Sequence, residues 1–203
     1  MIIPMKRIVT LLLVIVSSSS MLAQRTYYNQ AVNSCAGKSS EELISCIKNS
    51  YLLDYDFKTD QDKLVSTKEI KKPIVLITAA TWSAPCFGQV PALNRMVKKY
   101  HEQVEFIMIF WDSKDKIKRF QDKLDSRITL IPAGADDKVE KGNLDISGFV
   151  HKLDYPTAYL IDKNKKFLDV KRGAATPSKT MNWDQVTDTN TKELETFISQ
   201  VIN

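Results

Sequence analysis

The segment TWSAPC, from Thr81 to Cys86, holds the residue types best suited to thiol chemistry. It follows the apolar run PIVLITAA and precedes VPALNRMVKKY, whose apolar residues recur at helical spacing. A cysteine at the N-terminus of a helix is placed for nucleophilic chemistry, because backbone N–H groups and the helix dipole stabilise its thiolate. Cys86 is therefore the candidate catalytic thiol, and Ser83 stands three residues before it.

Ser83 limits the chemistry of this motif. A serine hydroxyl does not ionise near neutral pH, and neither His101 nor His151 lies near it in sequence to act as a base. Disulfide exchange needs an attacking thiolate and a second thiol that resolves the mixed disulfide. We therefore expect no two-electron dithiol cycling within the motif.

The N-terminus has the pattern of a secretory signal peptide over residues 1–23. Lys6 and Arg7 precede the nine-residue apolar stretch Ile8 to Val16, and small residues then lead to a cleavage point at Ala23. A helix needs roughly 20 residues to cross a bilayer. We expect an exported protein, periplasmic or secreted, without a permanent membrane span after cleavage.

Export permits disulfide bonds that the cytosol would reduce. The chain has three cysteines. We favour a local Cys35–Cys46 bridge, worth roughly 3 kcal/mol by loop entropy, which leaves Cys86 unpaired. The alternative is that all three are reduced and buried.

Composition excludes some function classes. The 203 residues are 43% hydrophobic and 26% charged, as in an ordinary soluble globular protein. The formal net charge is +5, and removal of Lys6 and Arg7 would lower it to +3. This excess is too small to indicate a dedicated nucleic-acid surface. The lysine-rich segment KDKIKRFQDK interleaves both signs and is typical of a solvated helix face.

The elements that would position the motif alternate between strands and helices. Continuous apolar runs predict buried strands in PIVLITAAT, VEFIMIFW and ITLIPA. Helices are expected at 87–102, with a kink at Pro91, and at 114–125, 144–153 and 191–202. Polar turns predict hairpins at 55–70 and 155–174, and loops are expected at 134–143 and 177–188.

Residues 24–50 are expected to form a polar N-terminal extension that ends in a short helix, capped by Ser39 or Ser40. The main domain then runs from 51 to 203. Its element order predicts an α/β fold with a mixed central sheet flanked by helices. TWSAPC lies where a strand ends and a helix begins, which is where such sheets place active sites.

With these residues in this order, the chain resembles the thioredoxin superfamily, and more closely its exported TlpA/ResA-type thiol-disulfide oxidoreductases. PIVLITAATWSAPCFGQVP follows the pattern of a strand, a tryptophan-led C-x-x-C and a proline early in the helix, with a match at Trp82, Pro85, Cys86 and Pro91. The resemblance covers residues 51–203 and implies a thioredoxin-like fold.

The resemblance also implies a binding groove beside the motif. Pro156, preceded by Tyr155, occupies the position of the family's cis-proline, so we predict a cis bond there. An apolar groove that holds an extended peptide through backbone hydrogen bonds would then be formed by Trp82, Ala84, Pro85, Tyr155 and Pro156.

Three departures make the motif degenerate. Ser83 replaces the family's exposed nucleophilic cysteine, and Gln89 replaces the acid three residues after the second cysteine. Ile77 stands where thioredoxins proper carry a buried acid. The proton relay that assists a resolving cysteine therefore has no evident carrier.

Four interpretations of Cys86 remain open. It is a buried structural thiol, or a single thiol that captures partners as mixed disulfides or adducts. In the third, S-x-x-C resembles the T/S-x-x-C motif of peroxiredoxins, although Ala79 stands where their proline is expected. In the fourth, Cys86 pairs with Cys35 or Cys46 of the extension.

The sequence thus favours a non-cycling binding or thiol-capture module for a peptide or protein partner, possibly one that contains a thiol. The alternative is a thiol-disulfide oxidoreductase or thiol peroxidase that acts through Cys86 alone. We expect no metal site, no cofactor and no nucleic-acid partner.

Overall fold

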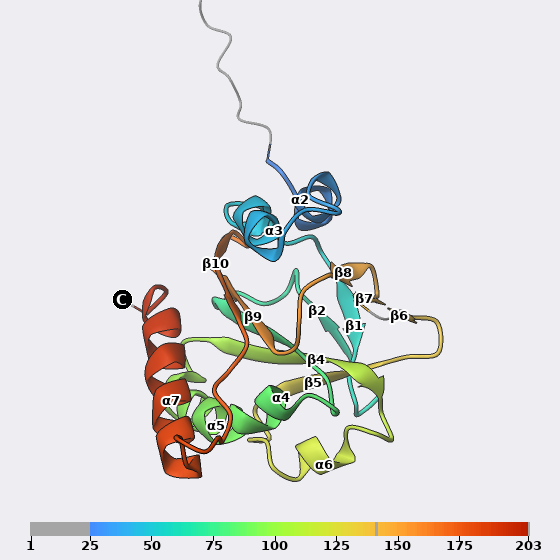
Figure 1. The fold of residues 1–203 in the computed structure, drawn as a ribbon. Helices are drawn as coiled ribbons and strands as arrows, with labels where there is room; N and C mark the ends of the chain where they lie inside the picture. The colour runs from blue at the N-terminus through green and yellow to red at the C-terminus, as the bar shows by residue number, and fades with distance from the viewer. Residues whose placement is uncertain (1–24, 141, 203) are drawn as a thin grey trace, which may run out of the picture.

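A five-stranded mixed sheet forms the centre of the molecule (Figure 1). The computed structural model describes residues 25–140 and 142–202, so the signal peptide predicted at 1–23 lies outside the described residues. The strand order is β10 (Phe167–Arg172), β9 (Thr157–Ile161), β3 (Ile74–Ala79), β4 (Glu105–Ser113) and β5 (Thr129–Ala133). The pairs β3–β4 and β4–β5 are parallel, whereas β9 is antiparallel to both β3 and β10. The predicted mixed α/β sheet is confirmed.

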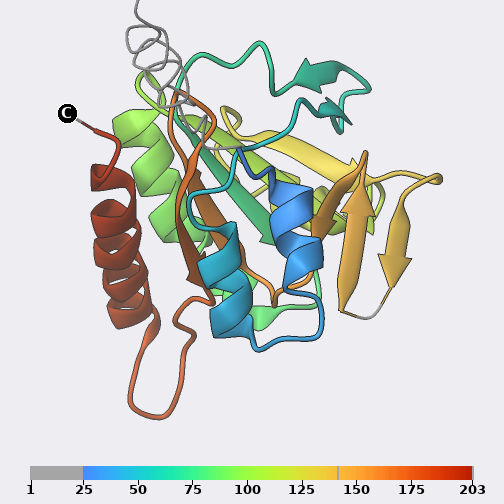
Figure 2. The same cartoon turned by 90° about the horizontal axis from the view of Figure 1, so that it is seen from above.

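The sheet is covered on both faces, which explains why its central strands are apolar without alternation. Every residue of β3 and β9 is buried. One face packs against the helices α4 (Ala84–Gly88), α5 (Val90–Tyr100), α6 (Lys118–Gln121) and α7 (Trp183–Ser199). Figures 1 and 2 show α2 (Tyr28–Ser34) and α3 (Ser40–Ile47) on the opposite face. The N-terminal extension therefore completes the hydrophobic core.

The helix expected at 87–102 is two helices that meet at Gln89. It begins earlier than predicted, at Ala84, and the break falls two residues before Pro91. Proline has no N–H to continue the helical ladder, so α5 starts anew at Val90 with Pro91 in its first turn. The short α4 thereby becomes a separate element that carries the motif.

The helix predicted at 144–153 was wrong. The helix expected at 144–153 is a pair of strands, and with β6 (Lys138–Glu140) the strands β7 (Asn143–Ile146) and β8 (Phe149–His151) form a three-stranded antiparallel sheet. Leu144 and Ile146 are buried and alternate with partly exposed residues, and a turn at Ser147 and Gly148 reverses the chain. The period is two, so the segment forms strands.

The closing helix α7 begins eight residues before its expected start at 191. Asn182 caps it by accepting a hydrogen bond from Gln185 N at 3.0 Å, and the Gln185 side chain accepts from Asn182 N at 2.9 Å. This reciprocal capping box satisfies backbone donors that a helix start leaves unpaired. The two predicted hairpins are present, as β1 (Asp56–Lys58) with β2 (Leu64–Ser66) and as β9 with β10.

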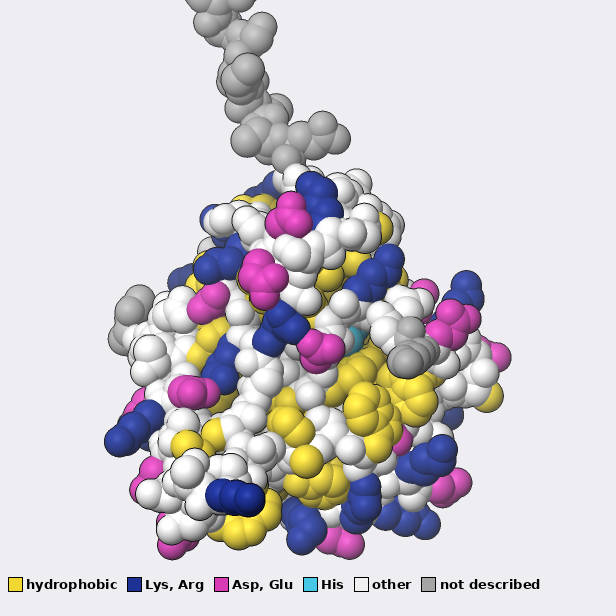
Figure 3. Space-filling model, in the orientation of Figure 1, with side chains coloured by type: hydrophobic (Ala, Val, Ile, Leu, Met, Phe, Trp, Pro, Cys, Tyr) yellow, Lys and Arg dark blue, Asp and Glu magenta, His cyan; other side chains and the backbone are white. Residues whose placement is uncertain are grey.

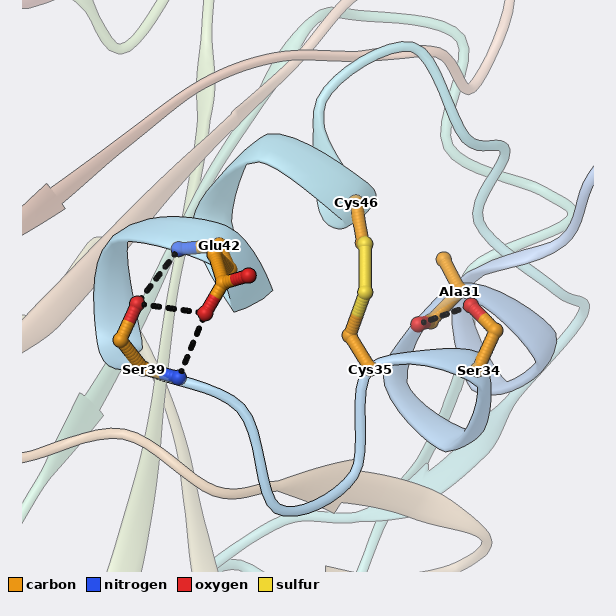
Figure 4. Close-up of a disulfide and its surroundings, with 6 residues drawn as sticks. All are labelled: Ala31, Ser34, Cys35, Ser39, Glu42 and Cys46. Atoms are coloured by element: carbon orange, nitrogen blue, oxygen red, sulfur yellow. Dashed lines mark hydrogen bonds between the residues drawn. A yellow bond between two sulfur atoms is a disulfide. The ribbon is translucent and has the colours of Figure 1, made fainter.

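The N-terminal extension has two helices where one was expected. In α3, Ser39 accepts from Glu42 N at 3.2 Å and Glu42 Oε2 accepts from Ser39 N at 3.1 Å (Figure 4), as the sequence predicted. The unpredicted helix α2 is joined to α3 by the predicted Cys35–Cys46 disulfide, with a Cα–Cα distance of 6.6 Å. The two short helices therefore form one cross-linked unit.

Candidate functional site

TWSAPC lies at the end of β3 and forms the tight turn that enters α4. Ser83 is the N-cap residue of α4, and its N–H donates to Ala80 O at 3.1 Å. Cys86 N donates in turn to Ser83 O at 3.1 Å. The motif thus lies between the end of the central strand β3 and the start of a helix, as the sequence predicted.

The Ser83 hydroxyl is directed at the loop that precedes β9. Its Oγ donates a hydrogen bond to the carbonyl oxygen of Tyr155 at 2.8 Å, and the residue is only 6% exposed. The Tyr155–Pro156 peptide bond is cis, the geometry predicted for this position. Since the serine proton is donated to a carbonyl and not to a base, this arrangement does not activate Ser83 as a nucleophile.

Cys86 is a free thiol with no exposed surface. Burial raises the pKa of this thiol to about 11; hydrogen bonds with Ser83 and the Ala80 backbone oppose the shift, and the Asp112 charge adds to it. The thiol is therefore protonated at neutral pH. Because Cys35 and Cys46 are bonded to each other, the interpretation that pairs Cys86 with one of them is wrong.

An aromatic hollow opens beside the motif. Trp82, 62% exposed, meets Trp111 and Tyr155 edge to face at ring-centroid distances of 6.0 Å and 5.7 Å. The hollow has a volume of about 510 Å³ and is lined by Trp82, Trp111, Gly142, Leu153, Asp154 and Tyr155. Figure 3 shows hydrophobic side chains gathered on this side of the molecule, in the area of α4 and the end of β4.

Only part of the predicted groove lines this hollow. Trp82 and Tyr155 do, whereas Ala84 and Pro85 lie in the first turn of α4 and Pro156 is buried. The sequence missed Trp111, which ends an apolar strand and shows no local signal of its own. Its position opposite Trp82 depends on the parallel pairing of β3 with β4.

Asp112 is a second residue that sequence reasoning missed. It is 4% exposed, and its two carboxylate oxygens accept from Thr81 N at 2.6 Å and Thr81 Oγ1 at 2.7 Å. Arg119 of α6 donates to Thr81 O, so every polar group of Thr81 is held. A charged residue that ends the apolar run VEFIMIFW was the available signal.

The two positions where the resemblance to the thioredoxin superfamily implied acids hold no charge here. Ile77 is 1% exposed and belongs to the core. Gln89 is 3% exposed, and its Nε2 makes no hydrogen bond within the described part of the chain. The carboxylate that bonds the motif directly is Asp112 on the neighbouring strand.

Two absences hold for residues 25–140 and 142–202. No group of three or more His, Cys, Asp or Glu side chains in these ranges is placed to hold a metal ion. Nor do they include a helix that has the length and apolar character needed to span a membrane.

The mixed sheet, the cis-proline loop and the S-x-x-C turn at the start of a helix together define a protein of the thioredoxin-like class. The AhpC/TSA family model matches residues 51–169, more than half of the chain, and the protein belongs to this family. The match begins after the extension that carries α2 and α3.

Two curated relatives have related functions in their names. The thioredoxin-like protein YneN of Bacillus subtilis strain 168 is 24% identical over 128 residues, which cover 61% of this chain and 70% of YneN. The thiol-disulfide oxidoreductase ResA of Bacillus thuringiensis subsp. konkukian is 29% identical over 119 residues, which cover 57% of this chain and 64% of ResA. The chain is thus similar to a thiol-disulfide oxidoreductase over 64% of that protein's length.

Two solved structures share the fold. A thio-disulfide isomerase from Thermus thermophilus has a TM-score of 0.51 at 17% identity and covers 70% of this chain and 92% of its own. A putative thiol:disulfide interchange protein DsbE from Chlorobium tepidum has a TM-score of 0.50 at 20% identity, with 62% and 85% covered. At these identities the likeness extends to the fold alone.

Proposed function

We propose that this protein is a non-cycling module that binds an extended peptide or protein segment in the hollow beside TWSAPC. The observation that carries the proposal is the contrast between an exposed Trp82 and a fully buried Cys86. The surface that could hold a partner is open, whereas the thiol that could react with it is closed off and protonated. Ser83 adds to this contrast because its hydroxyl is bonded to Tyr155 O.

The chemistry of the hollow indicates the kind of partner. Trp82, Trp111 and Tyr155 present aromatic edges and faces, which suit a bulky apolar side chain. A volume of about 510 Å³ is enough for one such side chain and part of its neighbours. Capture of a partner thiol by Cys86 would first require local opening of α4, so binding precedes any covalent step.

A fluorescence titration tests this proposal, with extended apolar peptides as the probe and tryptophan emission as the signal. Trp82→Ala is expected to weaken binding at least tenfold, because a buried aromatic anchor is typically worth more than about 1.4 kcal/mol. Trp183→Ala is the matched control, since Trp183 is also exposed, at 58%, but starts α7. Equal affinities of the two variants would overturn the proposal.

A second candidate function is a thiol peroxidase or oxidoreductase that acts through Cys86 alone. The AhpC/TSA match is the observation that favours it. The Cys86 thiolate would attack a hydroperoxide, form an S–O bond and break the O–O bond, and the departing alkoxide would take up a proton. Peroxide consumption that disappears in Cys86→Ala would establish this function, and equal rates would exclude it.

We further propose that the mature protein is exported after cleavage at Ala23 and comprises an extension, 24–50, and a thioredoxin-like domain, 51–203. The charged, apolar and small-residue segments before Gln24 support this, as does a disulfide in the extension. Intact-mass measurement of the protein from the extracytoplasmic fraction should give a chain that starts at Gln24. A chain that retains Met1 would contradict it.

A further inference from the structure

A buried chain of hydrogen bonds runs from the N-terminal extension toward the hollow. Tyr28 of α2 has no exposed surface, and its hydroxyl donates to the Tyr159 hydroxyl at 3.2 Å. Tyr159 OH lies 2.6 Å from His151 Nδ1. Thr78 Oγ1 lies 3.2 Å from His151 Nε2 and 3.4 Å from His151 Nδ1, and it donates to Thr157 O at 3.4 Å.

One arrangement of protons satisfies all of these groups. If His151 is neutral with its proton on Nε2, Nδ1 accepts from Tyr159 and Nε2 donates to Thr78. The hydroxyls of Tyr159 and Thr78 then each donate one hydrogen bond and accept one. The Tyr28 hydroxyl, at the start of the series, only donates. Burial lowers the pKa of His151 to about 3 and outweighs hydrogen bonds to the Leu153 and Asp154 backbone and the Asp154 charge.

The buried chain of hydrogen bonds ends at the wall of the hollow. The His151 ring is tilted against the Tyr155 ring at a centroid distance of 5.0 Å, and Tyr155 packs against Trp82. Thr157, whose carbonyl receives the last hydrogen bond, directly follows Pro156. His151 therefore contacts the segment 155–157 through both ring packing and a hydrogen-bonded hydroxyl.

Aromatic packing holds Tyr28, at the other end of the chain of hydrogen bonds. The Tyr28 ring stacks between Phe149 and Phe167 at centroid distances of 4.7 Å and 4.9 Å. Phe149 lies on β8, two residues before His151, so the same short strand carries both contacts. Tyr28 lies outside the residues that the family model matches.

We propose that His151 is a positioning residue that holds the Tyr155–Thr157 wall of the hollow for binding, and that Tyr28 of the N-terminal extension supports it through the hydroxyl of Tyr159. This inference rests on the proposed binding function. By this inference the N-terminal extension affects the affinity of the hollow for a peptide, although no residue of the extension lines the hollow.

Peptide affinity in paired variants tests the inference. Tyr28→Phe keeps the stacked ring but removes one hydrogen bond, so affinity is expected to fall roughly three- to tenfold. Tyr27→Phe is the matched control, because the neighbouring Tyr27 is 38% exposed, and it is expected to bind like the wild type. His151→Leu should cost more than His151→Asn, which retains an acceptor beside Tyr159.

A purely structural role would lower thermal stability without changing affinity, so the melting temperature of each variant is measured beside its affinity. Unchanged affinity in Tyr28→Phe, whatever its melting temperature, would overturn the inference.

A second measurement needs no ligand and separates this inference from the proposed function. Imidazole ¹⁵N shifts should show His151 neutral with its proton on Nε2 at pH 7, and Tyr28→Phe should move the Nδ1 signal whereas Tyr27→Phe should not. If the wild type binds no peptide, the proposed function fails, and these shifts still decide whether the buried chain of hydrogen bonds from Tyr28 to His151 is present. A proton on Nδ1, or an Nδ1 signal indifferent to Tyr28→Phe, contradicts the inference.

Discussion

Position 83 carries a serine hydroxyl and no thiol. The Ser83 hydroxyl donates to Tyr155 O, and Cys86 below it is buried with a pKa raised to about 11 by desolvation. That position 83 lacks a thiol could be read from the sequence, because residue identity alone decides it. Burial of Cys86 was only one of four open interpretations, because it depends on how α4 packs against the rest of the fold.

Ser83→Cys should restore the missing thiol. We expect the variant to form a disulfide with Cys86 under mild oxidant, and to gain insulin reduction that is absent from the wild type, because an attacking and a resolving thiol are then three residues apart. Free-thiol counting and an insulin turbidity assay measure both effects. Ser83→Ala is the control, and a Ser83→Cys variant that stays inert would show that the scaffold itself no longer supports exchange.

At the scale of elements, β4 and α6 fix the turn that carries the motif. Asp112 accepts both Thr81 donors, and Arg119 of α6 donates to the Thr81 carbonyl. Trp111, which precedes Asp112, lines the hollow. The end of one strand therefore supports the turn and supplies part of the wall of the hollow.

Asp112→Ala should destabilise the protein by about 2–3 kcal/mol, because two buried donors of Thr81 lose a charged acceptor. Urea unfolding measures this loss. Asp115→Ala is the control, since Asp115 is exposed and its replacement should stay within about 0.5 kcal/mol. Equal unfolding midpoints for the two variants would show that the Thr81 contacts contribute nothing to stability.

The elements also show what could be predicted from sequence. Continuous apolar runs gave the central strands, since burial on both faces leaves no other pattern. The segment 144–153 was assigned to a helix because the turn at Ser147 and Gly148 interrupts its alternation. The sequence analysis did not predict that α7 starts at Trp183. Asn182 and Gln185 form a capping box there, and this pattern can be recognised in a sequence.

At the scale of the whole molecule, the N-terminal extension is part of the core. Its residues cover the face of the sheet opposite α5 and α7, and Tyr28 connects it to His151. The sequence set this extension apart as a polar lead-in because its few apolar residues are scattered. Contacts of Tyr28 with Tyr159, 131 residues apart, have no local signature.

The buried His151 makes the stability of the molecule depend on pH. Its pKa is lowered from 6.5 to about 3 by burial, so between these values the unfolded chain binds a proton that the folded chain does not. The contribution of His151 to the free energy of unfolding is fully present above about pH 6.5. It falls by up to about 1.4 kcal/mol per pH unit as pH drops toward 3. Urea unfolding at pH 7 and pH 4.5 should show a smaller loss for His151→Leu than for the wild type. An identical loss would mean that His151 has the same pKa in the folded and unfolded states.

The most direct test of the central claim is the peptide affinity of Cys86→Ala beside that of Trp82→Ala. A non-cycling binding module predicts that Cys86→Ala binds within twofold of the wild type, because the thiol is buried, whereas Trp82→Ala loses at least tenfold. Loss of binding in Cys86→Ala with retention in Trp82→Ala would contradict the claim and assign the function to the thiol.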